Sequence, residues 1–232
     1  ISLKTFELNS KYKVSNKITV EFIEVTHSIP DSAILAIHTP YGIVLYAVDY
    51  KFDEQPQLGN PPNYRRLKEL GKEGVKCLIL ESLYADYDIE TPSEEDVKNE
   101  MLDIFLKLDT TNKTIITSTF SSHIVRLKTL VNTGQKLGRK VCLLGRSLNT
   151  HSSLAHELNI TDLKSGTMIV SRFEEINNLL ENVYADRDKY FLICTGHQGE
   201  EFSVLSRILD NRFDFSFSKD DIMLFSSSVI PT

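Results

Sequence analysis

The sequence predicts an α/β protein built from two parts of different texture, and three observations support this fold class. Short β-branched runs follow one another closely through the first third of the chain. From about residue 95, strand-like and helix-like runs alternate with short connections, as in a doubly wound sheet. The 232 residues are 41% hydrophobic and 25% charged, which is enough to bury a core and excludes a wholly disordered chain.

The β-rich part is expected to open with an antiparallel meander of three strands. Polar and apolar side chains alternate over residues 18–25, and the runs 34–39 and 43–48 flank the turn Pro40-Tyr41-Gly42. The stretch 53–63 contains three prolines and is expected to be a loop. A helix over 64–71 and a strand over 75–80 are expected to follow.

The next helix is predicted by a capping pattern. In Thr91-Pro92-Ser93-Glu94, Thr91 is expected to be the N-cap, Pro92 the first helical residue and Glu94 the residue that completes a capping box. This helix should run to about Leu108. The remaining elements are strands over 114–120, 140–145, 189–196 and 221–228, and helices over 122–137, 148–158, 174–182 and 202–209.

The charge distribution indicates a local anion-binding segment. The net charge of −6 argues against a generally basic nucleic-acid binder. From Lys113 to Arg146, however, there are seven basic residues and no acidic ones. Such a segment can form a phosphate footprint, because a local field is set by charges within roughly 10 Å. The alternative is an ordinary solvated helix face.

The cysteines and the hydropathy indicate a cytoplasmic protein without a membrane span. The three cysteines, Cys77, Cys142 and Cys194, each lie in an apolar strand-like run, so we expect reduced, buried thiols. No apolar run approaches the roughly 18 residues that cross a bilayer. The first residues also lack the pattern of a signal peptide.

Polar side chains follow several predicted strands, and His27 and Asp49 form the sharpest pair. An imidazole at one strand end and a carboxylate at the next-but-one strand end suit Zn²⁺, although a catalytic zinc site needs at least three protein ligands. The alternative is that His27 is structural and that Asp49 only caps a turn. Of the other histidines, His123 and His197 also follow strands, where α/β proteins bind ligands.

Together these motifs resemble a known family. They are Val25-Thr26-His27-Ser28-Ile29-Pro30-Asp31-Ser32, His38-Thr39-Pro40-Tyr41-Gly42, Val48-Asp49-Tyr50-Lys51-Phe52-Asp53, Glu81-Ser82, Thr91-Pro92-Ser93-Glu94, Thr119-Phe120-Ser121-Ser122-His123, Gly145-Arg146-Ser147 and Thr195-Gly196-His197-Gln198-Gly199-Glu200. The sequence resembles the metallo-β-lactamase ribonucleases of the β-CASP group and is most similar to ribonuclease J in its archaeal form. The resemblance covers nearly the whole chain.

The resemblance implies domains and site residues. Residues 1–94 would form part of a metallo-β-lactamase αββα sandwich, and 95–232 a doubly wound β-CASP domain. His27 matches a zinc ligand, and Asp49 matches a ligand that bridges two zinc ions and is required for catalysis. Glu81 matches a catalytic acidic residue behind the metal site, and Ser122 a serine that contacts an RNA phosphate.

The basic segment then predicts an RNA-backbone path. Ser122 should lie at or near the start of a helix, with Arg126 on the same face. Arg146 should reach the same point from an adjacent strand. The three remaining basic residues near the far end of that helix, Lys136, Arg139 and Lys140, are expected to be solvated.

The sequence also departs from the family. The His-x-His-x-Asp-His signature, which would precede residues 1–25, is absent, as are two histidine motifs that would follow Ser226–Thr232. We therefore expect a central piece of a longer enzyme that is inactive alone and binds zinc weakly or not at all. A missed ligand would most readily be His38.

The resemblance implies that the complete protein is a zinc-dependent ribonuclease with two zinc ions per active site. It would be a 5′→3′ exonuclease acting on 5′-monophosphorylated single-stranded RNA, with a homodimer as one assembly. Two alternatives stay open: a non-catalytic RNA-binding or assembly module, and a β-CASP endonuclease of the mRNA 3′-end-processing type.

Overall fold

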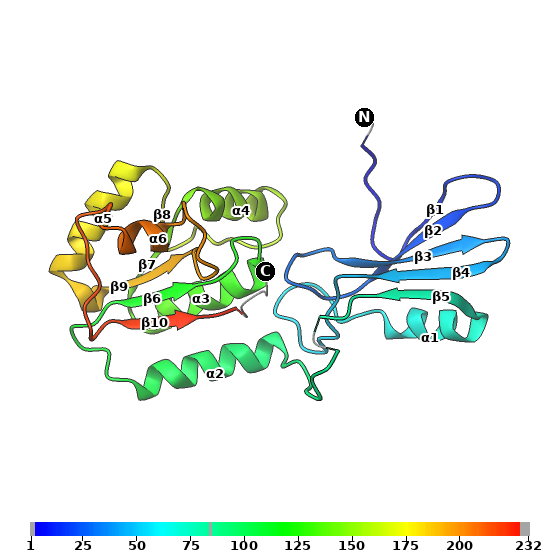
Figure 1. Ribbon diagram of the computed structural model, residues 1–232, viewed down its shortest axis with the longest axis horizontal. Coiled ribbons are helices and arrows are strands. Elements are labelled where there is room, and N and C mark those ends of the chain that lie inside the picture. Colours follow the sequence, from blue (N-terminus) through cyan, green and yellow to red (C-terminus); the bar gives the residue numbers. More distant parts are fainter. Residues whose placement is uncertain (1–2, 84, 228–232) are drawn as a thin grey trace. The chain divides into compact units, whose positions relative to one another are not determined.

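The computed structural model describes residues 3–83 and 85–227. The chain divides into two compact units, Ile1–Val97 and Lys98–Thr232. Each unit has a five-stranded sheet of its own (Figure 1). The predicted α/β class is therefore confirmed. Within the described residues, no helix combines the length and apolar character needed to cross a membrane.

The N-terminal unit has the strand order β1-β2-β3-β4-β5. The strands are β1 (Lys11–Lys13), β2 (Thr19–Glu24), β3 (Ala33–Thr39), β4 (Gly42–Ala47) and β5 (Val75–Leu80). β2, β3 and β4 form the predicted antiparallel meander, and β5 pairs with β4 in parallel. The short strand β1 was not expected, because a run of three residues, two of them lysines, is too short to carry a strand signal.

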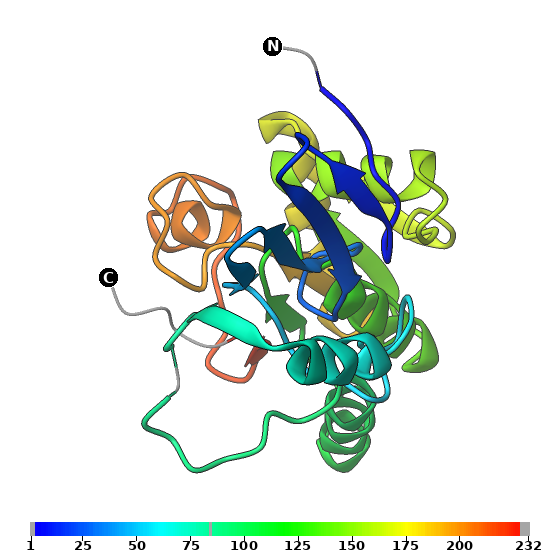
Figure 2. The same ribbon diagram turned by 90° about the vertical axis from the view of Figure 1, so that its right-hand side faces the viewer.

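Helix α1 (Tyr64–Glu73) lies on one side of this sheet (Figures 1 and 2). It begins after Asn63, whose side-chain oxygen accepts a hydrogen bond from the Arg66 backbone N–H at 3.1 Å. Its Leu70 side chain is fully buried and packs in a cluster with Ile23 of β2 and Ile34 of β3. Burying each such side chain contributes about 2–3 kcal/mol, which fixes the helix against the sheet.

Side chains from β1, β2, β3 and α1 form an ion cluster around a buried carboxylate in the same unit. Glu21 of β2 is 3% exposed and accepts hydrogen bonds from Arg66 Nε at 2.6 Å and Nη2 at 3.0 Å. His38 Nε2 lies 2.9 Å from the same carboxylate, and Lys11 Nζ lies 3.4 Å from it. Burial alone raises the pKa of Glu21, but the bonds from Arg66 and His38 outweigh it and lower the pKa to about 2. His38, which was considered as a missed metal ligand, therefore contacts Glu21 in this cluster.

The C-terminal unit has the strand order β10-β6-β9-β7-β8, and every pair is parallel. The strands are β6 (Ile115–Ser118), β7 (Lys140–Leu144), β8 (Thr167–Val170), β9 (Tyr190–Cys194) and β10 (Ile222–Phe225). The helices are α2 (Glu94–Lys107), whose first four residues belong to the N-terminal unit, α3 (Ile124–Lys136), α4 (Arg146–Glu157), α5 (Phe173–Ala185), the 3₁₀ helix η1 (Arg187–Lys189) and α6 (Val204–Leu209). Strand β8 was missed, because four residues after a turn carry too short a pattern.

Helices cover both faces of this sheet, as doubly wound folds require. On β9, Leu192 faces a cluster that contains Leu180 of α5 and Leu205 of α6. The neighbouring Phe191 points the other way and meets Phe105 of α2 edge-on, with ring centroids 5.7 Å apart. The alternation along β9 explains why its sequence is apolar throughout.

The predicted cap of α2 was wrong. The helix begins at Glu94, and Ser93 rather than Thr91 caps it, since Ser93 Oγ accepts a hydrogen bond from the Asp96 N–H at 3.0 Å. The Asp96 carboxylate accepts in return from the Ser93 N–H at 3.0 Å. In addition, Asp53 accepts from the Glu94 N–H at 2.8 Å. This contact from a distant loop fixes the start of the helix.

The expectation of three buried thiols was also wrong in part. Cys142 and Cys194 are buried, as expected, and burial raises the pKa of each to about 12. Cys77 is exposed. It lies on β5, an edge strand of its sheet whose side chains from Lys76 to Leu80 are exposed in the structure.

Candidate functional site

In the N-terminal unit, three candidate residues follow strands that run in the same direction. β2 and β4 are both antiparallel to β3, and β5 is parallel to β4. The carboxyl ends of these strands therefore share one edge of the sheet. His27 follows β2, Asp49 follows β4 and Glu81 follows β5.

An isolated bridge brings the first two residues together. Thr26 pairs with Lys51 in an antiparallel bridge, and the Lys51 N–H donates to the Thr26 carbonyl at 2.7 Å. The residue after Thr26 therefore runs beside the residues before Lys51. Glu81 is tied to the same edge, because its N–H donates to the Ala47 carbonyl at 3.4 Å.

The three candidate side chains at this edge differ in their burial and in their hydrogen bonds. His27 is half-buried, and its Nδ1 lies 3.1 Å from Ser28 Oγ. Glu81 is exposed and accepts a hydrogen bond from the Leu83 N–H at 3.2 Å. Asp49 is exposed, and within residues 3–83 and 85–227 its carboxylate has no hydrogen bond or ion pair. The described contacts therefore give Asp49 no role as a turn cap.

A buried charge cluster supports the segment that carries Asp49. Asp53 and Glu94 are 2% and 6% exposed, and Lys51 Nζ lies 3.4 Å from the first and 3.1 Å from the second. The hydrogen bond from the Glu94 N–H to Asp53 closes the cluster. Removing one partner would leave a buried charge unpaired, so this cluster holds the loop after β4 in place.

The residues present do not form a zinc site by themselves. Among the described residues, no three histidine, cysteine, aspartate or glutamate side chains come together as a metal-binding group. His27 and Asp49 have the right donor chemistry, but two ligands are one fewer than the smallest catalytic set. No catalytic step is therefore assigned to a metal held by this chain.

In the C-terminal unit, the topology marks a second site. The connection after β6 passes through α3 to β7, whereas the connection after β9 passes through α6 to β10, on the far side of β6. β6 and β9 are neighbours whose connections leave in opposite directions. Ligands of α/β sheets bind at the carboxyl ends of such strands.

Histidine and serine side chains gather at these two strand ends. His197 follows β9, and its Nδ1 lies 3.4 Å from Ser118 Oγ at the end of β6. Its ring meets Phe120 edge-on, with centroids 4.4 Å apart. Its Nε2 is buried and has no partner among the described residues. Burial lowers the pKa of His197, so the imidazole is neutral at pH 7.

His197 was noted among the strand-end histidines but was not predicted as a site residue. The loop that holds it depends on Gly196, at φ +126°. A Cβ at Gly196 would collide with Ser203 Oγ and lie 2.7 Å from Leu205 Cβ. The signal was in the sequence: a glycine and a histidine directly after a buried strand.

Ser122 lies close to the start of α3, as predicted, but it is not the cap. The N-cap is His123, whose Nδ1 accepts a hydrogen bond from the Arg126 backbone N–H at 3.3 Å. Ser122 is half-buried in the turn before it. The Arg126 guanidinium donates to the carbonyl and hydroxyl oxygens of Ser226, at 3.1 and 2.8 Å, which ties α3 to the end of β10.

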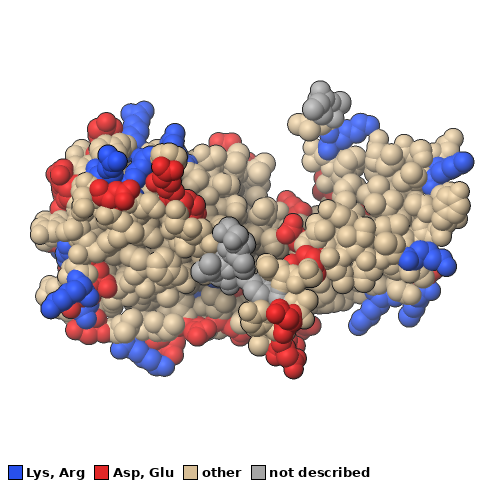
Figure 3. Space-filling model, in the orientation of Figure 1, with Lys and Arg blue, Asp and Glu red and all other residues tan. Residues whose placement is uncertain are grey.

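Two expectations about the basic segment were wrong. Arg146 is exposed at the start of α4, but its strand β7 is not adjacent to β6, because β9 lies between them. Arg139 is 8% exposed rather than solvated. Its guanidinium donates to the carbonyls of Lys113, Tyr190 and Thr110, at 2.8, 3.0 and 2.8 Å. On the face shown in Figure 3, basic and acidic side chains are interspersed over this unit.

Comparison with known proteins gives a consistent result. The family model of the β-CASP domain of ribonuclease J matches residues 112–232. The chain is 41% identical over 219 residues to ribonuclease J of Pyrococcus abyssi, covering 94% of this chain and 48% of the relative. It is 40% identical over 215 residues to ribonuclease J of Methanocaldococcus jannaschii, covering 92% and 48%.

A bacterial relative matches at lower identity. Ribonuclease J 1 of Streptococcus pyogenes is 33% identical over 228 residues, covering 97% of this chain and 39% of the relative. The chain thus spans about half the length of the archaeal relatives and less of the bacterial one. The match over 112–232 takes in the parallel sheet and the strand-end residues of the C-terminal unit. The chain belongs to the ribonuclease J family.

Proposed function

We propose that the complete protein is a metal-dependent ribonuclease that hydrolyses RNA phosphodiester bonds, and that this chain supplies its RNA contacts and part of its metal site. The observation that carries the proposal is the cluster at the ends of β6 and β9, in a chain of the ribonuclease J family. Because the chain spans about half the length of its archaeal relatives, the activity is proposed for the complete protein.

The C-terminal unit is proposed to hold the RNA backbone. The Ser122 hydroxyl and the neutral imidazole of His197 can each donate a hydrogen bond to a phosphate oxygen at pH 7. Arg146, two strands from β6, adds a cation about 10 Å away, since neighbouring strands lie about 4.8 Å apart. Arg126 positions the turn through its hydrogen bonds to Ser226.

The N-terminal unit is proposed to supply the hydrolytic part. His27 and Asp49 would be two of the ligands of a two-zinc site, and Glu81 would support it from the end of the next strand. Further ligands would come from parts of the complete protein outside this chain. The shared sheet edge and the exposed carboxylate of Asp49 support this assignment.

Asp49→Ala in the complete protein tests the catalytic assignment. Cleavage of a 5′-labelled single-stranded RNA should fall by at least 1,000-fold, because a carboxylate that holds the reacting centre is lost. The melting temperature should change little, since Asp49 is exposed and its carboxylate has no described partner. Asp188→Ala, which removes an exposed carboxylate before β9, is the control. Turnover near that of the wild type would refute the assignment.

Zinc content tests the ligand assignment separately. The complete protein should hold about two zinc ions, and His27→Ala should lose metal. This chain alone should retain far less than one zinc after dialysis, because it contributes two ligands. If the wild-type complete protein binds RNA but does not bind zinc and does not cleave RNA, the protein would instead be the non-catalytic RNA-binding module.

The salt dependence of RNA binding tests the backbone path. In the complete protein, Arg146→Ala should reduce the slope of log K against log salt concentration by about 0.7, the value for one phosphate contact on a single strand. Lys136→Ala, at the exposed far end of α3, should leave the slope unchanged. Equal reductions in both variants would mean that the segment is a diffuse positive surface.

Finer properties are proposed from the family resemblance. They are 5′→3′ direction, preference for a 5′-monophosphate, a homodimer and a cytoplasmic location. Comparison of 5′-monophosphorylated with 5′-hydroxyl RNA, each labelled at one end, tests the first two. Preferential shortening from a 5′-monophosphate is expected, whereas internal cuts that ignore the end would favour the endonuclease alternative.

A further inference from the structure

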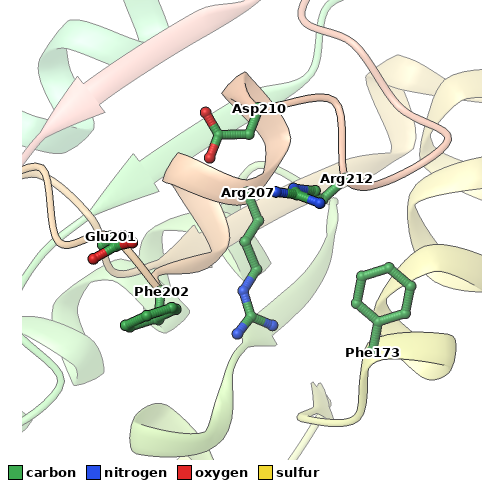
Figure 4. Close-up of a pocket in the computed structure, with 6 residues that line it drawn as sticks. All are labelled: Phe173, Glu201, Phe202, Arg207, Asp210 and Arg212. Atoms are coloured by element: carbon green, nitrogen blue, oxygen red, sulfur yellow. The ribbon is translucent and has the colours of Figure 1, made fainter.

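A pocket of about 440 Å³ lies in the C-terminal unit, outside the strand-end cluster. It is lined by two phenylalanines, two arginines and two carboxylates: Phe173, Phe202, Arg207, Arg212, Glu201 and Asp210 (Figure 4). Phe202 comes from the loop before α6, Arg207 from α6 and Phe173 from the start of α5. All six residues belong to one unit, so the pocket is defined within it.

The two aromatic rings offer stacking surfaces. Phe202 is 74% exposed, the largest exposed fraction of any phenylalanine among the described residues. Phe173 is 44% exposed, and its ring stacks on Phe213 at 4.8 Å with an interplanar angle of 21°. Phe213 is buried, so it holds the Phe173 ring in place and leaves part of that ring open to solvent.

The arginines are available to an anion. Within residues 3–83 and 85–227, the guanidinium groups of Arg207 and Arg212 make no hydrogen bond, ion pair or ring contact, although Glu201 and Asp210 line the same pocket. Figure 4 shows Arg207 extending between the rings of Phe202 and Phe173, with the Asp210 carboxylate on the opposite side of the helix. Among the described contacts, both guanidinium groups therefore keep their donors for a bound anion such as a phosphate.

The pocket continues the proposed RNA path. The Gly145 N–H at the end of β7 donates to the Val170 carbonyl at the end of β8 at 2.9 Å. A Cβ at Gly145 would lie 3.4 Å from Val204 at the start of α6. The ends of these strands and the start of α6 therefore meet beside Arg146, the residue after Gly145. Phe202 and Phe173 lie two and three residues from Val204 and Val170 along the chain.

We propose that this pocket binds one nucleotide of a single-stranded RNA, with the base stacked on Phe202 or Phe173 and the phosphate on Arg207. The inference rests on the proposed function and deepens it, because it extends the path from the strand-end cluster past Arg146. Aromatic faces beside an arginine are the chemistry that recognises an unpaired base with its phosphate. A free nucleoside monophosphate carries the same groups, so the test separates these two sources.

Binding of a fluorescent ten-nucleotide single-stranded RNA to the complete protein, made uncleavable by Asp49→Ala, tests the proposal. Phe202→Ala should weaken binding by about 5- to 100-fold, the loss expected for one stacked base, without changing the salt slope. Arg207→Ala should weaken binding and reduce the slope by about 0.7, and Arg207→Lys should restore the slope. The controls are Leu209→Ala, an exposed apolar residue of α6 that does not line the pocket, and Lys136→Ala.

The outcomes separate this inference from the proposed function. If the parent protein binds no RNA, the proposed function fails. If it binds RNA and the pocket variants bind as tightly as the controls, this inference alone is overturned. Uridine monophosphate, tested by displacement of the labelled RNA, should compete only at millimolar concentration. Competition at the concentration at which the unlabelled RNA competes would assign the pocket to a free nucleotide and overturn the RNA path.

Discussion

Glu21→Gln should destabilise the N-terminal unit in a way that depends on pH. Glu21 is buried on β2 and is the acceptor at the centre of three positive or potentially positive groups, Arg66, Lys11 and His38. Glutamine has nearly the same shape but no charge, so it keeps the packing and removes the attraction to Arg66. The variant therefore isolates the electrostatic contribution of one carboxylate.

The magnitude follows from the pKa. The pKa of Glu21 falls from 4.5 to about 2, despite the opposing effect of burial. After allowance for solvent screening, this shift corresponds to about 2 kcal/mol. Because the folded-state pKa lies below the unfolded value, the contribution is complete above about pH 4.5. It is lost as the pH falls from there through about 2.

Urea unfolding at pH 7, 4 and 2.5 measures the effect. Seven of the nine tyrosines lie in residues 1–97, so near-ultraviolet circular dichroism reports mainly on this unit. The difference between wild type and Glu21→Gln should be about 2 kcal/mol at pH 7 and should shrink markedly at pH 2.5. Glu69→Gln, which loses more exposed ion pairs, should cost less than about 0.5 kcal/mol. An equal difference at pH 7 and pH 2.5 would refute the electrostatic reasoning.

Two further predictions concern the C-terminal unit and the thiols. Arg139→Met should destabilise that unit by about 3 kcal/mol, because one buried and two partly buried carbonyls lose a charged donor. Far-ultraviolet circular dichroism during urea unfolding would measure this loss, and a loss no larger than that of the exposed Lys136→Met would contradict the prediction. A disulfide reagent at pH 8 should label one thiol rapidly in the native chain and three after denaturation, because Cys77 is exposed while burial raises the pKa of Cys142 and Cys194 to about 12. Rapid labelling of the native Cys77→Ser variant would disprove that assignment.

Local signals were enough to predict most elements. The meander over 18–48 and the strand 75–80 could be read from alternation and β-branched runs, because these depend only on neighbouring residues. The positions of His27, Asp49, Glu81 and Ser122 at strand ends followed in the same way. Polar residues directly after a buried strand mark that end whatever the strand's partners are.

The order of the strands could not be predicted. β9 lies between β6 and β7, which separates Ser122 from Arg146 and brings His197 beside β6. Strand order depends on contacts between residues far apart in the chain, and the local pattern of each strand is the same in either order. For this reason, His197 was noted in the sequence but its place between Ser118 and Phe120 was not foreseen.

Burial of single side chains was likewise decided by tertiary structure. Arg139 was expected to be solvated and is buried, whereas Cys77 was expected to be buried and is exposed. Arg139 is buried because three carbonyls converge on its guanidinium, and Cys77 stays exposed because its strand forms an edge. The sequence by itself determined the α/β class, the resemblance to the ribonuclease J family and the strand ends that carry the candidate site. Only the tertiary structure decided which of those ends meet, because that depends on packing between distant segments.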